Sequence, residues 1–270
     1  MWILYVVLAL VALYLFLISP AWKHNAVIDA IGRQDLAHRG LYDNEAGIPE
    51  NSLAAFQRAI DHGFGMEMDV QLTADGQLVV FHDAPTLRMT GVEGRIRDLT
   101  LAEIRELRLL GTDELIPTFG EFLALVHGQV PLCIEIKCDG NNGAALSERV
   151  FEELDRYEGP YYVESFDPRA LWWVRRHRPL VGRGQLALPA EQPKFIDFAA
   201  GQLLMNFASR PHFIAYDCRS SRRQLAPILC RKLFRAVAVE WTVLDEARIR
   251  ENRALGITSI FEGFIPEKED

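Results

Sequence analysis

The sequence predicts an α/β protein, a (β/α)8 TIM barrel with an inserted β-hairpin, preceded by one N-terminal transmembrane helix. Two observations predict the barrel. After about residue 34, short apolar runs alternate with amphipathic stretches, and eight of these runs are typical of parallel strands. A third observation predicts the membrane helix, because residues 1–22 contain no charged side chain.

The N-terminal segment predicts a single membrane span. A helix over residues 1–22 would reach roughly 30 Å, the thickness of a hydrocarbon layer. A cleaved secretory signal would need a basic start and a small-x-small site, and a buried soluble helix is the remaining alternative. Lys23 and Arg33 follow the segment, which favours a cytoplasmic body. We therefore expect a transmembrane helix (1–22), a linker (23–35) and a barrel (36–270).

A helix is expected between most of the strands, and residues 84–127 are expected to form a longer, partly helical excursion. The strand candidates are 35–38, 65–70, 132–136, 161–165, 184–188, 213–217, 236–243 and 258–263. The helix candidates are 52–63, 147–157, 168–178, 195–205, 223–234 and 245–255. Thr100 with Glu103, and Thr118 with Glu121, have capping-box spacing and predict two further helix starts. An open doubly wound sheet is the alternative, but no GxGxxG follows the first strand.

The apolar run 79–82 is expected to be a returning strand. Only "TADGQ" separates it from the run 65–70, and a parallel crossover needs a dozen or more residues. The connection must therefore be an antiparallel hairpin, with Asp75 and Gly76 in its turn.

Glu67, Asp69 and His82 indicate a site on this hairpin. Glu67 and Asp69 share a strand face because they are two residues apart, and the hairpin brings His82 roughly opposite Glu67. Close carboxylates repel each other unless a cation lies between them, and their oxygens suit Mg²⁺ or Ca²⁺. An alternating strand with its acids in water stays open as the alternative.

Two more strand ends add charged side chains. Glu135 and Lys137 share one face of a run that is otherwise apolar, and His38 and Arg39 end the first strand, where barrel enzymes keep their chemistry. A third carboxylate would complete an oxygen-rich cation site, and histidines next to it could transfer protons during phosphoryl chemistry. An exposed Glu–Lys pair and a hydrogen-bonded core histidine are the alternatives.

Composition argues against a nucleic-acid partner. The formal net charge is -8, from 37 acidic and 29 basic residues, and no run of Lys or Arg provides a face for a phosphate backbone.

Several segments closely resemble the glycerophosphodiester phosphodiesterase family. In order they are "AHRG", "PENSLAAFQRAIDHG", "EMDVQLTADGQLVVFHD", "TGVEGRIRDLTLAEI", "IPTFGEFL" and "PLCIEIK". The resemblance is dense over 36–139 and sparser afterwards, where "VESFDP" and "AVAVEWTV" match later strand ends.

The resemblance implies a barrel that hydrolyses glycerophosphodiesters to sn-glycerol 3-phosphate and an alcohol with a divalent cation. In this family the 2-hydroxyl of the substrate is thought to attack phosphorus, giving a cyclic phosphodiester that water opens. The roles that the resemblance implies are acid and base for His38 and His82, cation ligands for Glu67, Asp69 and Glu135, and phosphate binding for Arg39 and Lys137. It also implies that Glu50 lies near the metal and Trp241 near the substrate, while Asn51 is of the type that caps a helix.

Departures from the family pattern fall late in the chain. Leu244 follows "WTV" where the family commonly has Asn, and "FEGFIP" replaces a Thr-Asp before the last proline. These changes lie at the expected rim of the substrate site, so the sequence does not predict which headgroup the protein accepts. The expected substrate is a glycerophosphodiester; a lysophospholipid, cleaved by a membrane-associated lysophospholipase D, is one alternative, and a non-catalytic barrel that binds headgroups is another.

Overall fold

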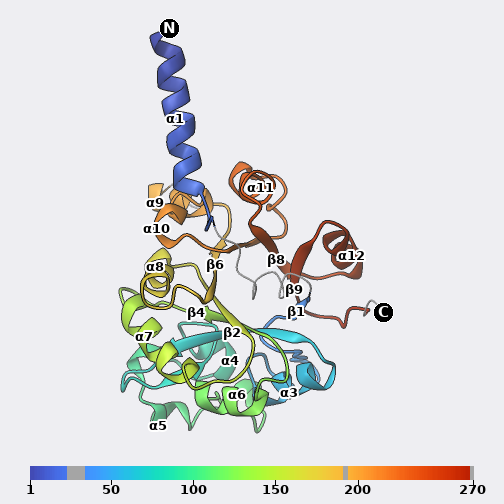
Figure 1. Cartoon of the computed structure of the whole chain (residues 1–270). Helices are drawn as coiled ribbons and strands as arrows, with labels where there is room; N and C mark the ends of the chain where they lie inside the picture. The colour runs from blue at the N-terminus through green and yellow to red at the C-terminus, as the bar shows by residue number, and fades with distance from the viewer. Residues whose placement is uncertain (23–33, 191–193, 268–270) are drawn as a thin grey trace.

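Eight parallel strands form a closed barrel in the computed structural model, which describes residues 1–22, 34–190 and 194–267. The strand order is β1-β9-β8-β7-β6-β5-β4-β2, and pairing of β1 with β2 closes the ring. Figure 1 labels several of these strands. The strands are β1 (Leu36–Ala37), β2 (Gly65–Leu72), β4 (Leu132–Ile136), β5 (Tyr161–Ser165), β6 (Gly182–Ala187), β7 (Phe213–Asp217), β8 (Val237–Val243) and β9 (Ile257–Phe261). The predicted barrel is confirmed.

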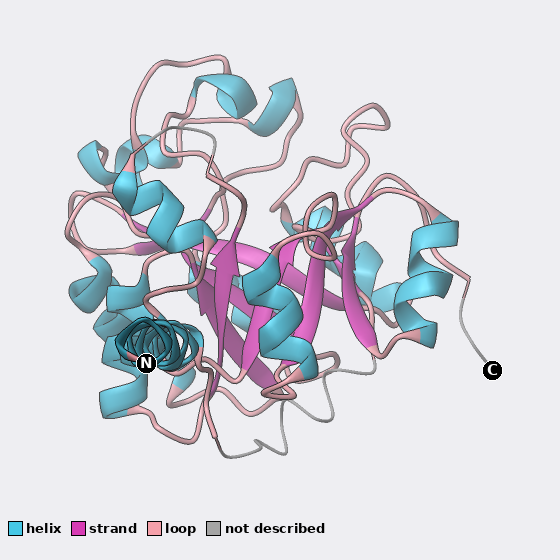
Figure 2. Cartoon of the chain, turned by 90° about the horizontal axis from the view of Figure 1, so that it is seen from above, coloured by secondary structure: helices cyan, strands magenta, loops and turns pink. Residues whose placement is uncertain are grey.

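Helices surround the barrel (Figure 2). They are α3 (Leu53–Asp61), α6 (Phe119–Val126), α7 (Gly143–Leu154), α8 (Pro168–His177), α9 (Phe195–Gly201), α10 (Asn206–Ser209), α11 (Leu225–Lys232) and α12 (Glu246–Ala254). Each of the six predicted helices is present. Both predicted capping boxes form as well, at Thr100 before a short helix and at Thr118 before α6.

The inserted hairpin is also confirmed. Strand β3 (Leu78–Val80) pairs antiparallel with β2, and Gly76 in the turn has a φ of 76°, a left-handed conformation that favours glycine. After the hairpin the chain makes an excursion with its own small apolar cluster. Its elements are α4 (Leu87–Thr90), η1 (Ile96–Asp98), α5 (Leu101–Ile104) and η2 (Leu109–Gly111).

The N-terminal helix differs from the prediction. Helix α1 (Trp2–Ile18) has 17 residues and points away from the barrel (Figure 1). Among the described residues, no helix is both long enough and apolar enough to cross a membrane. The predicted transmembrane span over 1–22 is therefore not supported. One physical reason is that the last turn belongs to the body, where Ile18 is buried and its carbonyl accepts a hydrogen bond from Asn206. The segment 23–33, with Lys23 and Arg33, lies outside the described residues.

The barrel interior is apolar towards the amino ends of the strands and acidic towards their carboxyl ends. Side chains alternate along a strand, so Cys133 and Glu135 of β4 share the inner face with Tyr162 of β5. The ring of Phe213 fills the space beside Gly184, where an added Cβ would come within 2.0 Å of it. These apolar groups close the barrel below its carboxyl end and exclude water beneath the acids.

Candidate active site

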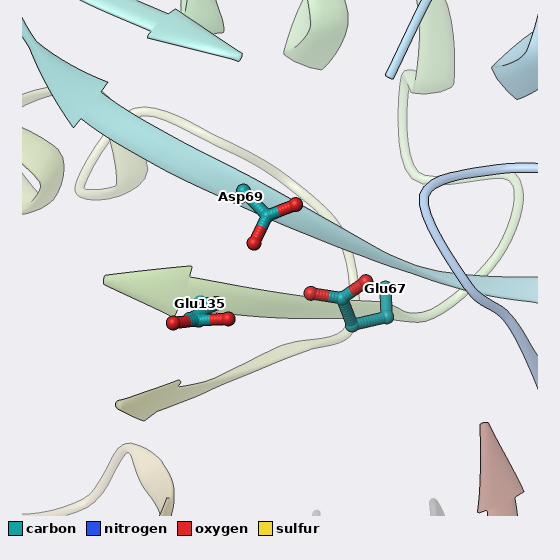
Figure 3. Close-up of side chains that lie close together, drawn as sticks. All are labelled: Glu67, Asp69 and Glu135. Atoms are coloured by element: carbon teal, nitrogen blue, oxygen red, sulfur yellow. The ribbon is translucent and has the colours of Figure 1, made fainter. Parts of the chain in front are cut away.

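Three carboxylates meet at the carboxyl ends of two neighbouring strands. Glu67 and Asp69 extend from β2 and Glu135 from β4, where Asp69 and Glu135 are register partners (Figure 3). All three are buried, and one oxygen from each lies within 4.8 Å of the others. The prediction that these three acids gather in one place is confirmed.

The electrostatics of this trio suit a cation. Burial, followed by repulsion from Asp69 and other acids, raises the pKa of Glu67. Burial likewise raises the pKa of Glu135 to about 7, although Lys137 opposes the change. Burial also acts to raise the pKa of Asp69, but Lys137, His82 and Arg39 together outweigh it and lower that pKa. A hard divalent ion would relieve the repulsion, and the donors are all carboxylate oxygens, so these residues fit Mg²⁺ or Ca²⁺.

Two basic side chains border the acids. Lys137 Nζ lies 2.9 Å from Asp69 Oδ1 and 3.0 Å from Glu135 Oε2. Arg39 donates from Nη1 to Glu50 at 2.6 Å, and its backbone N–H donates to Glu67 Oε2 at 3.2 Å. Both predicted phosphate-binding residues therefore lie at the site, held in place by carboxylates.

His38 is oriented by an acid from the far end of the chain. Its Nδ1 lies 2.5 Å from Glu262 Oε2, and its Nε2 lies 3.8 Å from Glu67 Oε2. Burial alone would raise the pKa of Glu262, but the hydrogen bond and the charge of His38 lower it to about 2. Glu262 is thus a stable carboxylate partner, and the second ring nitrogen of His38 is left on the side of the trio.

His82 is held in a similar way. Its Nδ1 lies 2.6 Å from Asp83 Oδ1, and Gln71 Nε2 donates to the carbonyls of Phe81, His82 and Asp83. Burial lowers the pKa of His82, which favours the neutral ring, although Asp69 opposes the change. The prediction that His82 lies opposite Glu67 needs correction. Pairing of Val70 with Val80 shifts the register by one residue, which places His82 level with Met68 beyond the end of β3, and the charge of Asp69 acts on its ring.

Glu50 and Asn51 support the site from the loop before α3. The N-cap of α3 is Ser52, whose hydroxyl accepts from the Ala55 N–H. Asn51 is therefore not the cap; it instead donates from Nδ2 to Asp69 Oδ2 at 2.9 Å. Glu50 accepts from Arg39 and Arg88, and it does not belong to the group of three acids.

Trp241 lies at the mouth of the barrel, at the carboxyl end of β8. Its ring packs edge-on against Phe166, with centroids 5.6 Å apart. It lines a pocket of about 490 Å³ together with Leu244, the residue that departs from the family pattern, and Glu262. Since Glu262 also holds His38, the pocket adjoins the ionic site.

Four further polar residues at the site escaped sequence reasoning: Asp83, Gln71, Glu262 and Glu164. Asp83 could have been found, because it directly follows His82. Glu164 carried a signal too, as an acid inside the apolar run "YYVES"; it is buried, and burial followed by the charge of Glu135 raises its pKa to about 8. Nothing in the sequence linked Glu262 to His38 across 224 positions.

Comparisons with known proteins match most of the chain to one family. The model described as "Glycerophosphoryl diester phosphodiesterase family" matches residues 38–265. A glycerophosphodiester phosphodiesterase of Caldanaerobacter subterraneus is 37% identical over 163 residues, covering 56% of this chain and 65% of that protein. The chain thus spans under two thirds of this relative, and under half of mammalian glycerophosphodiester phosphodiesterase 1.

Solved structures share the fold. The glycerophosphodiester phosphodiesterase of Thermotoga maritima matches with a TM-score of 0.64 and 27% identity, over 84% of this chain and 92% of that one. A phosphodiesterase of Oleispira antarctica, solved in complex with the product sn-glycerol-3-phosphate, matches with a TM-score of 0.69 and 24% identity, over 85% and 92%.

Proposed function

The chain belongs to the glycerophosphoryl diester phosphodiesterase family, and on this premise we propose that it hydrolyses glycerophosphodiesters to sn-glycerol 3-phosphate and an alcohol. The observation that carries the proposal is the buried trio of Glu67, Asp69 and Glu135, bordered by Lys137. Buried acids that repel one another are unfavourable in a purely structural barrel. Their arrangement is expected where a cation and a phosphate bind.

Glu67, Asp69 and Glu135 would hold the divalent cation, Mg²⁺ or Ca²⁺. When bound, such an ion withdraws charge from phosphate oxygens and so stabilises the charge that develops during displacement. Lys137 and Arg39 supply further positive charge for the phosphate. Their contacts with Asp69 and Glu50 fix both side chains before a substrate arrives, which lowers the entropic cost of binding it.

The histidines would transfer the protons. His82, whose pKa is lowered by burial, is the neutral base: it accepts the proton of the 2-hydroxyl as that oxygen attacks phosphorus. His38, beside the ionised Glu262, is the acid: it donates a proton to the leaving alcohol as the P–O bond breaks. Water then opens the cyclic phosphodiester, with His38 accepting a proton from water and His82 returning one to the 2-oxygen.

The proposal is tested with the full chain and glycerophosphocholine, following phosphorus NMR. We expect sn-glycerol 3-phosphate as the product, loss of turnover on chelation, and recovery on adding Mg²⁺ or Ca²⁺. Glu67→Gln removes one charge at nearly constant volume and should abolish turnover while circular dichroism stays unchanged. The matched control is Glu103→Gln, on the exposed surface away from the site. No turnover by the wild type at saturating cation, with headgroup binding retained in Glu67→Gln, would instead support a non-catalytic headgroup-binding barrel.

A second substrate class is favoured by α1. Most of its apolar side chains are exposed, as is Trp22 beyond its end. We propose that this surface attaches the barrel to a lipid bilayer, so that the same chemistry can act on a lysophospholipid as a lysophospholipase D. Flotation with phosphatidylcholine vesicles tests attachment. Headgroup release from a lysophospholipid, with no release from glycerophosphocholine, would make the lysolipid the true substrate. The cytoplasmic location of the barrel stays a prediction.

A further inference from the structure

We propose that Glu164 is an outer carboxylate of the cation site, whose charge strengthens cation binding without touching the substrate. The inference rests on the cation site of the proposed function. Glu164 lies on β5, and its register partner on β4 is Glu135, which in turn pairs with Asp69 on β2. Register partners in a parallel sheet point to the same face. Three acids therefore form one row across three neighbouring strands, inside the barrel.

Among the described residues, Glu164 has no charged partner that accounts for its burial, although the Cys133 thiol hydrogen-bonds to its side chain. Only 1% of the residue is exposed, and its Oε2 has no hydrogen-bond partner among the described residues. Its neighbours towards the barrel floor are Cys133 and Tyr162, which carry no charge. An ionised carboxylate at this buried position would be favourable only with positive charge nearby.

The charge of Lys137 acts on Glu164, but no direct ion pair forms between them. Lys137 is the basic side chain of this row, and its ammonium group is already bonded to Asp69 and Glu135. In the described part of the chain, no Lys or Arg forms an ion pair with Glu164. Glu67, Asp69, Glu135 and Glu164 thus bring four carboxyl groups to a site where Lys137 and Arg39 are the nearby cations. A bound divalent ion would restore the balance of charge.

The position of Glu164 assigns it to an outer shell. The close group, in which one oxygen from each acid lies within 4.8 Å of the others, contains Glu67, Asp69 and Glu135 but not Glu164. Glu164 therefore acts on the ion through its charge and through a ligand or water that the ion holds. It is a positioning residue, and groups of this kind commonly change metal affinity about 10- to 100-fold.

The test is calorimetric titration of metal-stripped full chain with CaCl₂ and with MgCl₂. Glu164→Gln keeps the shape of the side chain and removes the charge, so we expect the dissociation constant to rise by about 10- to 100-fold. Glu164→Asp keeps the charge and should recover part of that loss. The matched control is Glu240→Gln: Glu240 is an equally buried strand acid, but Arg222 and Arg248 satisfy it, so cation affinity should not change.

A second readout separates charge from structure. With saturating cation, the charge of Glu164 stabilises the bound ion in the wild type but not in Glu164→Gln. The rise in melting temperature on adding cation should therefore be smaller in the variant. Unchanged affinity and an equal rise in both proteins would overturn the inference. So would equal losses in Glu164→Asp and Glu164→Gln. If neither the wild type nor Glu67→Gln binds the cation, the proposed cation site is wrong. If the wild type binds it and Glu67→Gln does not, the cation site is supported, and the Glu164 variants alone decide the role of Glu164.

Discussion

His38 and His82 share one local design. Each has its Nδ1 within 2.6 Å of a carboxylate, Glu262 for His38 and Asp83 for His82. A carboxylate at Nδ1 fixes the orientation of the ring and leaves Nε2 for the reaction. Burial lowers the pKa of His82, and Lys137 and Arg39 lower it further, although the charge of Asp69 opposes them. The lowered pKa is the basis for proposing His82 as the base, and the contact with the ionised Glu262 is the basis for proposing His38 as the acid.

The assignment predicts how leaving groups affect two variants. His38→Ala and His82→Ala should each lower kcat about 10²- to 10⁴-fold with glycerophosphocholine. A nitrophenyl ester of glycerol phosphate has a leaving group that needs no proton, so His38→Ala should recover most of its rate and His82→Ala should not. The measurement is kcat for both substrates at saturating cation. Equal recovery in the two variants would show that the roles are assigned wrongly.

The His38–Glu262 pair also predicts a dependence of stability on acid. The pKa of Glu262 is lowered from 4.5 to about 2 in the folded chain, against the effect of burial, because His38 bonds it. A lowered carboxyl pKa stabilises the folded state at pH values above 4.5, and this contribution disappears as the pH falls towards 2. Urea unfolding at pH 6 and pH 3 should therefore show a larger loss of unfolding free energy for wild type than for Glu262→Gln. Equal losses of unfolding free energy in the two proteins would mean that the His38–Glu262 pair does not contribute to stability.

At the scale of the elements, the hairpin positions His82 through one side chain. Gln71, buried on β2, donates to the carbonyls of residues 81, 82 and 83, and so ties the loop after β3 to the barrel. Gln71→Leu removes those donors and leaves buried acceptors unsatisfied. We expect unfolding free energy to fall by about 1–3 kcal/mol and kcat to fall with it. Gln77→Ala, in the exposed turn of the same hairpin, is the control and should change neither quantity. A stable Gln71→Leu enzyme with normal kcat would exclude this role.

Local spacing predicted those parts of the site that depend on a single strand or hairpin. Glu67 and Asp69 share a face because of strand geometry alone, and "TADGQ" is too short for anything but a hairpin. The sequence pattern does not predict the exact register, because it does not say where the turn begins, and the observed register places His82 one residue away from the expected position, level with Met68. Asn51 was assigned to the cap for a similar reason, since Ser52 is equally suited to capping.

Closure of the barrel brought together residues that local patterns could not pair. The alternation of strands and helices predicted eight barrel strands, and in the closed ring β1 pairs with both β2 and β9. Only this closure puts Glu262, just after β9, against His38, just after β1. Hydropathy does not show where the exposed part of α1 ends and the part that packs on the barrel begins. The predicted span over 1–22 is not supported, and the helix ends at Ile18, which is buried against the barrel.

The boundary predicts which part of α1 stabilises the whole molecule. Ile18 is fully buried in an apolar cluster with Leu203 and Tyr216, whereas Leu8, on the same helix, is 55% exposed. Ile18→Ala should therefore lower the unfolding free energy of the chain by about 2–5 kcal/mol, because it leaves a cavity between α1 and the barrel. Leu8→Ala should change it by less than about 0.5 kcal/mol. Urea unfolding followed by tryptophan fluorescence measures both. Equal effects would mean that α1 is not anchored through its last turn, and that the barrel folds independently of it.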